Sequence, residues 1–145
     1  MKIALCGSMV FSEKMIEVKK DLEKMGHRVI LPQLIEDYVG KKPRQIAQLA
    51  SRDKKQHDCI RQDWIRVRSS EGILILNYDH KGVPGYIGGN TLLEMSFAHV
   101  LFRLIFLLQP IPDIVFYRSE IEAMNPLVIN ADFGKIQEKF LKKNR

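Results

Sequence analysis

The chain has 145 residues, of which 46% are hydrophobic and 28% are charged, and its formal net charge at pH 7 is +6. This length is typical of one domain, and this composition argues against disorder, a collagen-like repeat and a membrane protein. The longest apolar run, residues 100–108, is interrupted by Arg103 and is far shorter than the roughly 20 residues that cross a bilayer. The N-terminal residues have the pattern of a strand and not of a secretory signal, so we expect one cytoplasmic domain over residues 1–145.

Cysteines and charge narrow the class further. Cys6 and Cys59 form no CxxC pair, so the sequence predicts neither a zinc site nor a disulfide, and we expect both thiols to be reduced. The basic excess is local, because residues 41–68 hold nine Lys or Arg and three Asp. No aromatic residues alternate with these charges and no RNA or DNA motif accompanies them, which makes nucleic acid an unlikely partner. A solvated helix face is the favoured interpretation, with an anionic small ligand nearby as the main alternative.

The N-terminal half predicts a strand–helix–strand unit followed by one long helix. Residues 2–6 are a short apolar run that stops at Gly7, as a buried strand does. Apolar residues then recur at helical spacing over residues 12–25, and residues 27–31 form a second strand that ends at Pro32. From Pro43 a single helix is expected to reach about Ser69. Its apolar stripe consists of Ile46, Leu49, Ala50, Ile60, Trp64 and Val67.

The C-terminal half continues the alternation of strands and helices. Residues 72–77 are apolar on both faces, which suits a central parallel strand, and residues 78–89 form a glycine-rich loop. A helix capped by Asn90 or Thr91 is expected to reach about Leu101. Further elements are expected at residues 103–108 (strand), 119–124 (helix), 127–129 (strand) and 133–142 (helix). The whole pattern predicts a single α/β domain with a doubly wound parallel sheet of about five strands and helices on both faces.

Ligands of such sheets bind beyond the carboxyl ends of the strands, so the loops at residues 7–12 and 78–91 should matter most. The first loop matches neither a Walker loop nor a dinucleotide-binding fingerprint, and it lacks the acidic residues of a phosphoacceptor. No GxSxG elbow or HExxH pair occurs, so serine hydrolases and metalloproteases lack their motif.

The remaining motif is the run from Gly88 to Glu94. Its paired glycines, Gly88 and Gly89, let the backbone approach a ligand, and the free N–H groups of the following helix suit a hydroxylated or phosphorylated sugar. Glu94 is expected in the first turn of that helix. Two interpretations remain open at this point, because Thr91 and Glu94 also have the spacing of a capping box, in which the glutamate only returns a hydrogen bond to the cap.

A second carboxylate favours catalysis. Asp63 borders the buried stripe of the long helix and should face the same loop as Glu94. Two carboxylates flanking a sugar are the usual equipment for cleaving a glycosidic bond, although a hydrogen-bonded structural role for Asp63 is an alternative. Asp53 and His57 also fall on the stripe. They could line a pocket or, as we favour, pair with each other, and a metal site with Asp58 and Cys59 is a remote alternative.

Taken together, the strand ending Leu5-Cys6-Gly7-Ser8, the helix with Asp63, the strand GILILN and the segment GYIGGNTLLEMSFA resemble the nucleoside 2-deoxyribosyltransferase superfamily, which includes the 2′-deoxynucleoside 5′-phosphate N-hydrolases. The resemblance covers most of residues 1–130. It implies a Rossmann-like or flavodoxin-like sheet, a homodimer or higher oligomer, and no metal or organic cofactor.

The resemblance also implies roles for individual residues. Glu94 would be the nucleophile that attacks the anomeric carbon of a nucleoside or nucleotide, and Asp63 would protonate or orient the leaving base. The expected substrate-binding residues come from the two loops. They are Gly7, Ser8, Met9, Phe11, Gly88, Gly89, Asn90 and Thr91.

Other functions remain open. The run from Gly88 to Glu94 is also similar to the GGxGTxxE motif of the lysine-decarboxylase-like nucleotide phosphoribohydrolases, from which it differs at Asn90. The loop Met9-Val10-Phe11-Ser12 replaces the glycine- and arginine-bearing loop of many phosphate-accepting N-hydrolases, so a 5′-phosphate is not implied. A binding module that retained the pocket without turnover is the alternative outside the enzymes. Apolar residues at 111–116 suggest an exposed face on which copies of the chain could assemble.

Overall fold

A single sheet of five parallel strands, in the order β2-β1-β3-β4-β5, organises the computed structural model, which describes all of residues 1–145. This is the flavodoxin-like order of a doubly wound fold, as the alternation of elements predicts. In chain order the elements are β1 (Lys2–Cys6), the 3-10 helix η1 (Met9–Phe11), α1 (Ser12–Lys24), β2 (Arg28–Ile30), the 3-10 helix η2 (Ile35–Tyr38), α2 (Pro43–Gln56), α3 (Cys59–Arg68), β3 (Gly72–Ile75), α4 (Gly89–Val100), β4 (Leu104–Leu107), α5 (Arg118–Ala123), β5 (Leu127–Val128) and α6 (Gly134–Lys143).

Helices cover both faces of the sheet because the strand side chains alternate between two apolar clusters. Along β1, Ile3 and Leu5 point to one face, where they pack with residues of α1 and α6. Ala4 and Cys6 point to the other face, against residues of α3, α4 and α5. Both clusters are closed to solvent at their centres. The central strands β1 and β3 are therefore apolar on both sides, as expected of parallel strands between two layers of helices.

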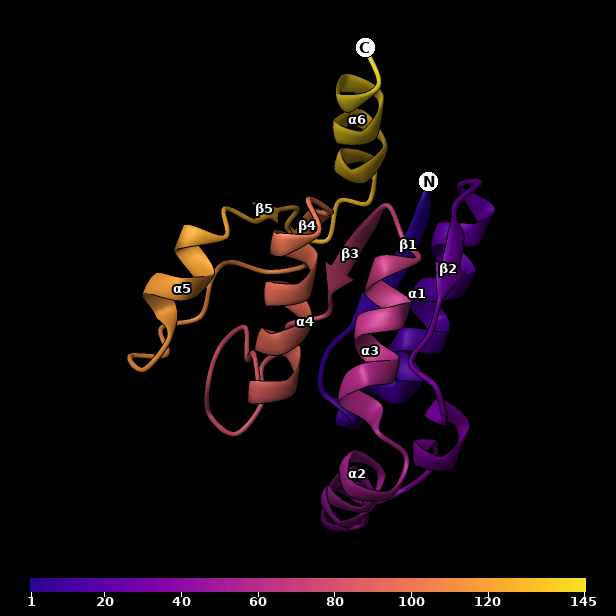
Figure 1. Cartoon of the computed structure of the whole chain (residues 1–145), viewed down its shortest axis with the longest axis vertical. Helices are drawn as coiled ribbons and strands as arrows, with labels where there is room; N and C mark the ends of the chain where they lie inside the picture. Colours follow the sequence, from indigo (N-terminus) through magenta and orange to yellow (C-terminus); the bar gives the residue numbers. More distant parts are fainter.

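The long helix expected from Pro43 to Ser69 is two helices. The chain breaks at His57 and Asp58, and Asp58 adopts a left-handed conformation with φ of 48°. Aspartate tolerates this conformation better than most residues, so the sequence does not signal the break as a glycine would. Figure 1 shows the result, in which α3 runs along the sheet while α2 turns away beneath it. The prediction of one helix with a continuous apolar stripe was therefore wrong. Ile60, which was assigned to that stripe, is exposed.

The other element boundaries agree with the sequence to within about two residues, with one consequence for the site. The helix expected to be capped by Asn90 or Thr91 begins at Gly89, and its N-cap is Gly88. Glu94 consequently lies in the second turn of α4 and not in the first. No helix of the structure combines the length and apolar character needed to cross a membrane.

The topology fixes where a ligand can bind. Strand order reverses between β1 and β3, because the chain passes from β1 to β2 on one side and continues through β3 to β5 on the other. Crevices in open parallel sheets form at this switch point, beyond the carboxyl ends of the strands. In Figure 1, α2 lies beyond that same edge, below the tip of β3, so it can form an outer wall to the crevice.

Candidate active site

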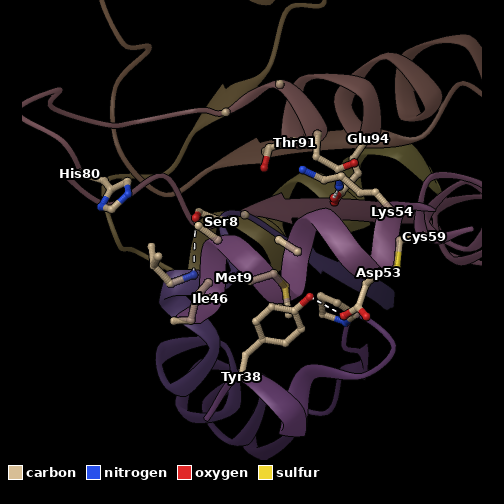
Figure 2. Close-up of a pocket in the computed structure, with 18 of the residues that line it drawn as sticks. Ser8, Met9, Tyr38, Ile46, Asp53, Lys54, Cys59, His80, Thr91 and Glu94 are labelled. Carbon is tan, nitrogen blue, oxygen red and sulfur yellow. Dashed lines mark hydrogen bonds between the residues drawn. The ribbon is translucent and has the colours of Figure 1, made fainter. Parts of the chain in front are cut away.

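A cavity of about 360 Å³ opens at the switch point between β1 and β3. Seven of the eight expected substrate-binding residues line it, together with both expected carboxylates. These nine residues are Gly7, Ser8, Met9, Asp63, Gly88, Gly89, Asn90, Thr91 and Glu94. Figure 2 shows the cavity between the start of α4, which carries Thr91 and Glu94, and the segment that carries Tyr38.

Phe11 is the one expected substrate-binding residue that does not line the cavity. Its ring packs edge-on against the rings of Tyr78 and His80, with centroid distances of 5.1 and 5.8 Å. His80 does line the cavity, so Phe11 supports this part of the wall from behind. Burial lowers the pKa of His80, and the positive charge of nearby Lys81 lowers it further. Both effects favour the neutral imidazole.

Asp63 and Glu94 lie side by side and are held by the same two donor groups. Asn90 Nδ2 donates to Asp63 Oδ2 at 2.9 Å and to Glu94 Oε1 at 3.1 Å. Arg66 Nη2 donates to Asp63 Oδ1 and to Glu94 Oε2, both at 3.2 Å. Each donor nitrogen has two hydrogens, so one serves each carboxylate. The two side chains are thereby fixed relative to each other, although they come from different helices.

Arg66 is the residue of this cluster that the sequence analysis missed. It lies three residues after Asp63 on the buried side of α3, and its side chain is only 6% exposed. Its Nη1 donates to the backbone carbonyl of Leu5 in β1, which ties the guanidinium to the sheet. The spacing could have identified this residue. Arg66 lies three residues after Asp63 and therefore on the same side of the helix, and an arginine that is buried usually pairs with a carboxylate.

The protonation of Glu94 follows from this arrangement. Glu94 is 3% exposed and Asp63 is 8% exposed, and one guanidinium faces both carboxyl groups. Burial raises the pKa of Glu94 to about 7, with a further contribution from the charge of Asp63, while Arg66 opposes the rise. The pair is therefore expected to hold one proton up to about neutral pH. Cys6 lies beneath Glu94, and burial raises the pKa of its thiol, so it stays neutral.

The capping-box interpretation of Thr91 and Glu94 is wrong. Thr91 is the third residue of α4 and does not cap it, and the carboxylate of Glu94 accepts from Asn90 and Arg66. In Figure 2 the buried Thr91 side chain projects toward the cavity from the start of α4. A Cβ added at Gly89 would meet no atom within 4 Å, so the space around this residue at the start of α4 is open. At Gly7, φ of 152° favours glycine directly after β1.

A third carboxylate, that of Asp53, lies on the outer wall of the cavity. Asp53 of α2 is 1% exposed and accepts a hydrogen bond of 2.6 Å from the hydroxyl of Tyr38 in η2. Arg52 donates to its other oxygen through Nε and Nη2, at 2.8 and 2.7 Å. The expected pairing of Asp53 with His57 is only a long ionic contact of 3.9 Å. Asp53 thus lines the pocket, and Tyr38 is its main partner.

No group of three or more His, Cys, Asp or Glu side chains is placed to hold a metal ion, so the remote alternative of a metal site with Asp58 and Cys59 has no support. Comparisons of the chain with protein-family models, curated proteins and solved structures found no match. The chemical capacity of the site is that of two adjacent carboxyl groups with one shared cation, in a cavity of the size that holds a small ligand.

Proposed function

We propose that this protein cleaves or transfers the N-glycosidic bond of a nucleoside or nucleotide, with Glu94 as nucleophile and Asp63 as general acid. The observation that carries the proposal is the fixed pair of Asp63 and Glu94 in the wall of the switch-point cavity. The motif resemblance supports the same roles. The proposed reaction requires neither a metal ion nor an organic cofactor.

The spacing of the two carboxylates favours a covalent intermediate. Asp63 Oδ1 and Glu94 Oε2 lie no farther apart than twice their common distance of 3.2 Å from Arg66 Nη2. Glycosidases that use a direct attack by water separate their carboxyl groups by roughly 6.5–9.5 Å to make room for it. A closer pair suits attack by one carboxylate on the anomeric carbon.

In the first step, a Glu94 oxygen forms a bond to the anomeric carbon while the bond from that carbon to the base nitrogen breaks. Asp63 donates its proton to the departing base, which leaves as the neutral species. The step needs Glu94 ionised and a proton on Asp63, so the proton that Glu94 carries up to about pH 7 has to move to Asp63 before the attack. Arg66 and Asn90 contact both groups, and they keep the carboxylates aligned whichever one holds the proton.

In the second step, an acceptor attacks the anomeric carbon of the glycosyl-enzyme ester. Asp63, now ionised, takes a proton from the acceptor, and the bond to Glu94 breaks to restore the carboxylate. With water as the acceptor the reaction is hydrolysis. With a second nucleobase it is transfer.

A panel of nucleosides and 5′-nucleotides tests the proposal. We expect the release of free base at a rate proportional to enzyme concentration, and its loss in Glu94→Ala. Ribose and 2-deoxyribose substrates, with and without a 5′-phosphate, belong in the same panel. Addition of a second base distinguishes transfer from hydrolysis. If no member of the panel releases its base, the proposed activity is wrong.

A non-catalytic binding module is the second candidate, and one observation favours it. Every oxygen of Asp63 and Glu94 already accepts a hydrogen bond from the protein, as in a cluster that serves only to hold two helices together. This candidate predicts that nucleotides raise the melting temperature without any release of base. The panel separates the two functions.

We also propose that the chain forms a homodimer or higher oligomer. Val115 and Phe116, in the connection between β4 and α5, are 87% and 91% exposed. Large apolar side chains so exposed in one segment are typical of an association surface. Light scattering at micromolar concentration should give at least twice the mass of 16.8 kDa, and a monomeric mass would contradict the proposal.

A further inference from the structure

The outer wall of the cavity carries a polar pair that the proposed chemistry does not use. Tyr38 and Asp53 both line the cavity, and Figure 2 shows their hydrogen bond well apart from Thr91 and Glu94. Both residues are buried, and they belong to η2 and α2, which lie outside the sheet. A ligand that reaches from Glu94 across the cavity would place its far end against this pair.

The hydrogen bonds around Tyr38 and Asp53 leave neither side chain a hydrogen to donate to a ligand. The Tyr38 hydroxyl donates its single hydrogen to Asp53 Oδ2, so its oxygen can only accept a further bond. Arg52 directs two N–H groups to Asp53 Oδ1. Burial opposes the ionisation of Asp53, but the hydrogen bonds from Tyr38 and Arg52 outweigh it and lower the pKa of Asp53. The pKa of Tyr38 is raised, mainly by burial and also by its hydrogen bond to Asp53. At neutral pH the pair therefore consists of a carboxylate and an intact phenol.

The surroundings of the pair suit a flat ring. Pro43, Ile46, Ala47 and Ala50 line the same part of the cavity from α2. Lys54 is the one cation of α2 that lines the cavity, but it is exposed and is held by no salt bridge. The buried polar side chains of this wall, Tyr38 and Asp53, can only accept further hydrogen bonds.

We propose that Tyr38 and Asp53 read the edge of the leaving base and select bases that carry an exocyclic amino group over their oxo counterparts. The proposal rests on the proposed function, because that function makes a nucleobase the group at this end of the cavity. An amino group donates to the free lone pairs of the two oxygens. An oxo group at the same place would bring acceptor against acceptor and leave buried groups unpaired, which disfavours binding.

Binding of free bases tests the selection without any catalysis. The probes are two pairs that differ in this group, adenine with hypoxanthine and cytosine with uracil, measured by calorimetry on the wild-type chain. We expect the amino member of each pair to bind about 10- to 100-fold more tightly, the effect of one unsatisfied buried hydrogen-bonding group. Equal affinities, a preference for the oxo member, or no binding of any base would overturn the proposal.

Substitutions locate the preference. In Asp53→Asn the amide can turn its NH₂ group toward the ligand, so the preference should fall to about threefold or less, or reverse. Tyr38→Phe removes one acceptor and leaves the other, so the preference should shrink without reversing. Asp58→Asn is the matched control, because Asp58 is exposed, lies just beyond α2 and does not line the cavity, and this variant should keep the full preference. An unchanged preference in Asp53→Asn would overturn the assignment to this pair.

The same measurements separate this inference from the proposed activity. If nucleosides lose their bases but amino and oxo bases bind equally, the selection is wrong and the activity stands. If the amino bases bind preferentially and no nucleoside or nucleotide is cleaved, the proposed activity is wrong and the selection stands.

Discussion

The two ends of the cavity treat a buried carboxylate in opposite ways. At the outer wall, Asp53 has its own arginine and a tyrosine hydroxyl, and its pKa is lowered. At the sheet, Arg66 is shared between Asp63 and Glu94, and the pKa of Glu94 is raised to about 7. Both ends are buried and both contain an arginine. Burial raises both pKa values, but the hydrogen bonds from Tyr38 and Arg52 outweigh it at Asp53, whereas the shared Arg66 does not outweigh it at Glu94, where the charge of Asp63 adds to the rise. One end is therefore a fixed acceptor, and the other is a group that can exchange a proton.

Removal of the proposed nucleophile should produce the largest effect, and it tests the end of the cavity that lies at the sheet. We expect Glu94→Gln to lower kcat by at least about 10³-fold, because the covalent step is lost, while the variant stays folded. A 2-fluoro-substituted nucleoside should trap a glycosyl adduct on Glu94 of the wild type, visible by intact-protein and peptide mass spectrometry. Full activity in the variant, or an adduct on Asp63, would contradict the assigned roles.

Asp63 should matter next, and its effect should depend on the leaving group. Asp63→Asn removes the proton donor and should slow natural substrates by roughly 10²- to 10⁴-fold. Substrates whose leaving group needs no proton should be slowed much less. In the wild type, kcat/KM for natural substrates should fall as the pH rises through about 7, where the pair loses its proton, and the substrates that need no proton should not show this fall. Equal losses for both kinds of substrate would exclude Asp63 as the acid.

The two arginines offer a matched comparison of stability. Arg66→Met leaves two buried carboxyl groups without a cation and should cost about 3–5 kcal/mol of unfolding free energy at pH 8. The cost should shrink toward pH 5, because protonation of Glu94 removes one of the two uncompensated charges. Arg52→Met should cost much less, since the Arg52 side chain is 40% exposed and Tyr38 still donates to Asp53. Chemical denaturation at both pH values measures the difference, and equal costs would refute the comparison.

The smallest expected effect is the pH dependence of stability, which should differ in sign between Glu94 and Asp53. Because the pKa of Glu94 is raised to about 7 in the folded chain, its contribution to stability is present at low pH and lost as the pH rises toward 8. Glu94→Gln lacks this loss, so its stability should improve relative to the wild type by about 2 to 3 kcal/mol between pH 5 and pH 8. Asp53→Asn should show the opposite trend, with a cost at neutral pH that disappears in acid, since the pKa of Asp53 is lowered. Parallel curves for the two variants would show that the ends do not differ.

Much of the fold was predictable because most strands and helices have a recognisable local sequence pattern. The apolar runs at residues 2–6 and 72–77 mark central strands, and the glycines around them mark turns. The single sheet follows from this alternation. The sequence also predicted that Asp63 approaches the loop before α4. That prediction depends only on the face of the helix that carries Asp63 and on its distance along the helix from the turn before β3.

The remaining features depend on contacts between distant parts of the chain. No local pattern reveals the break at Asp58, because its left-handed conformation needs no glycine. Nor does a local pattern pair Tyr38 with Asp53, since η2 and α2 meet only in the folded chain. Arg66 was missed because an arginine in a basic segment looks like a solvent-exposed charge. The N-terminus of α4 was misplaced because Asn90 and Thr91 are good capping residues, yet their side chains face the cavity.

The break between α2 and α3 divides the cavity into parts that can change independently. The carboxylates that would perform the reaction lie on α3 and α4, which pack against the sheet, whereas the wall that would contact the base lies on η2 and α2, on the other side of the turn at His57 and Asp58. Exchange of residues in α2 can therefore alter which base is accepted without displacing Asp63 or Glu94. Mutational libraries for new base preferences are best confined to residues 35–38 and 43–56, and evolution has the same route to diversify substrates while it preserves the chemistry.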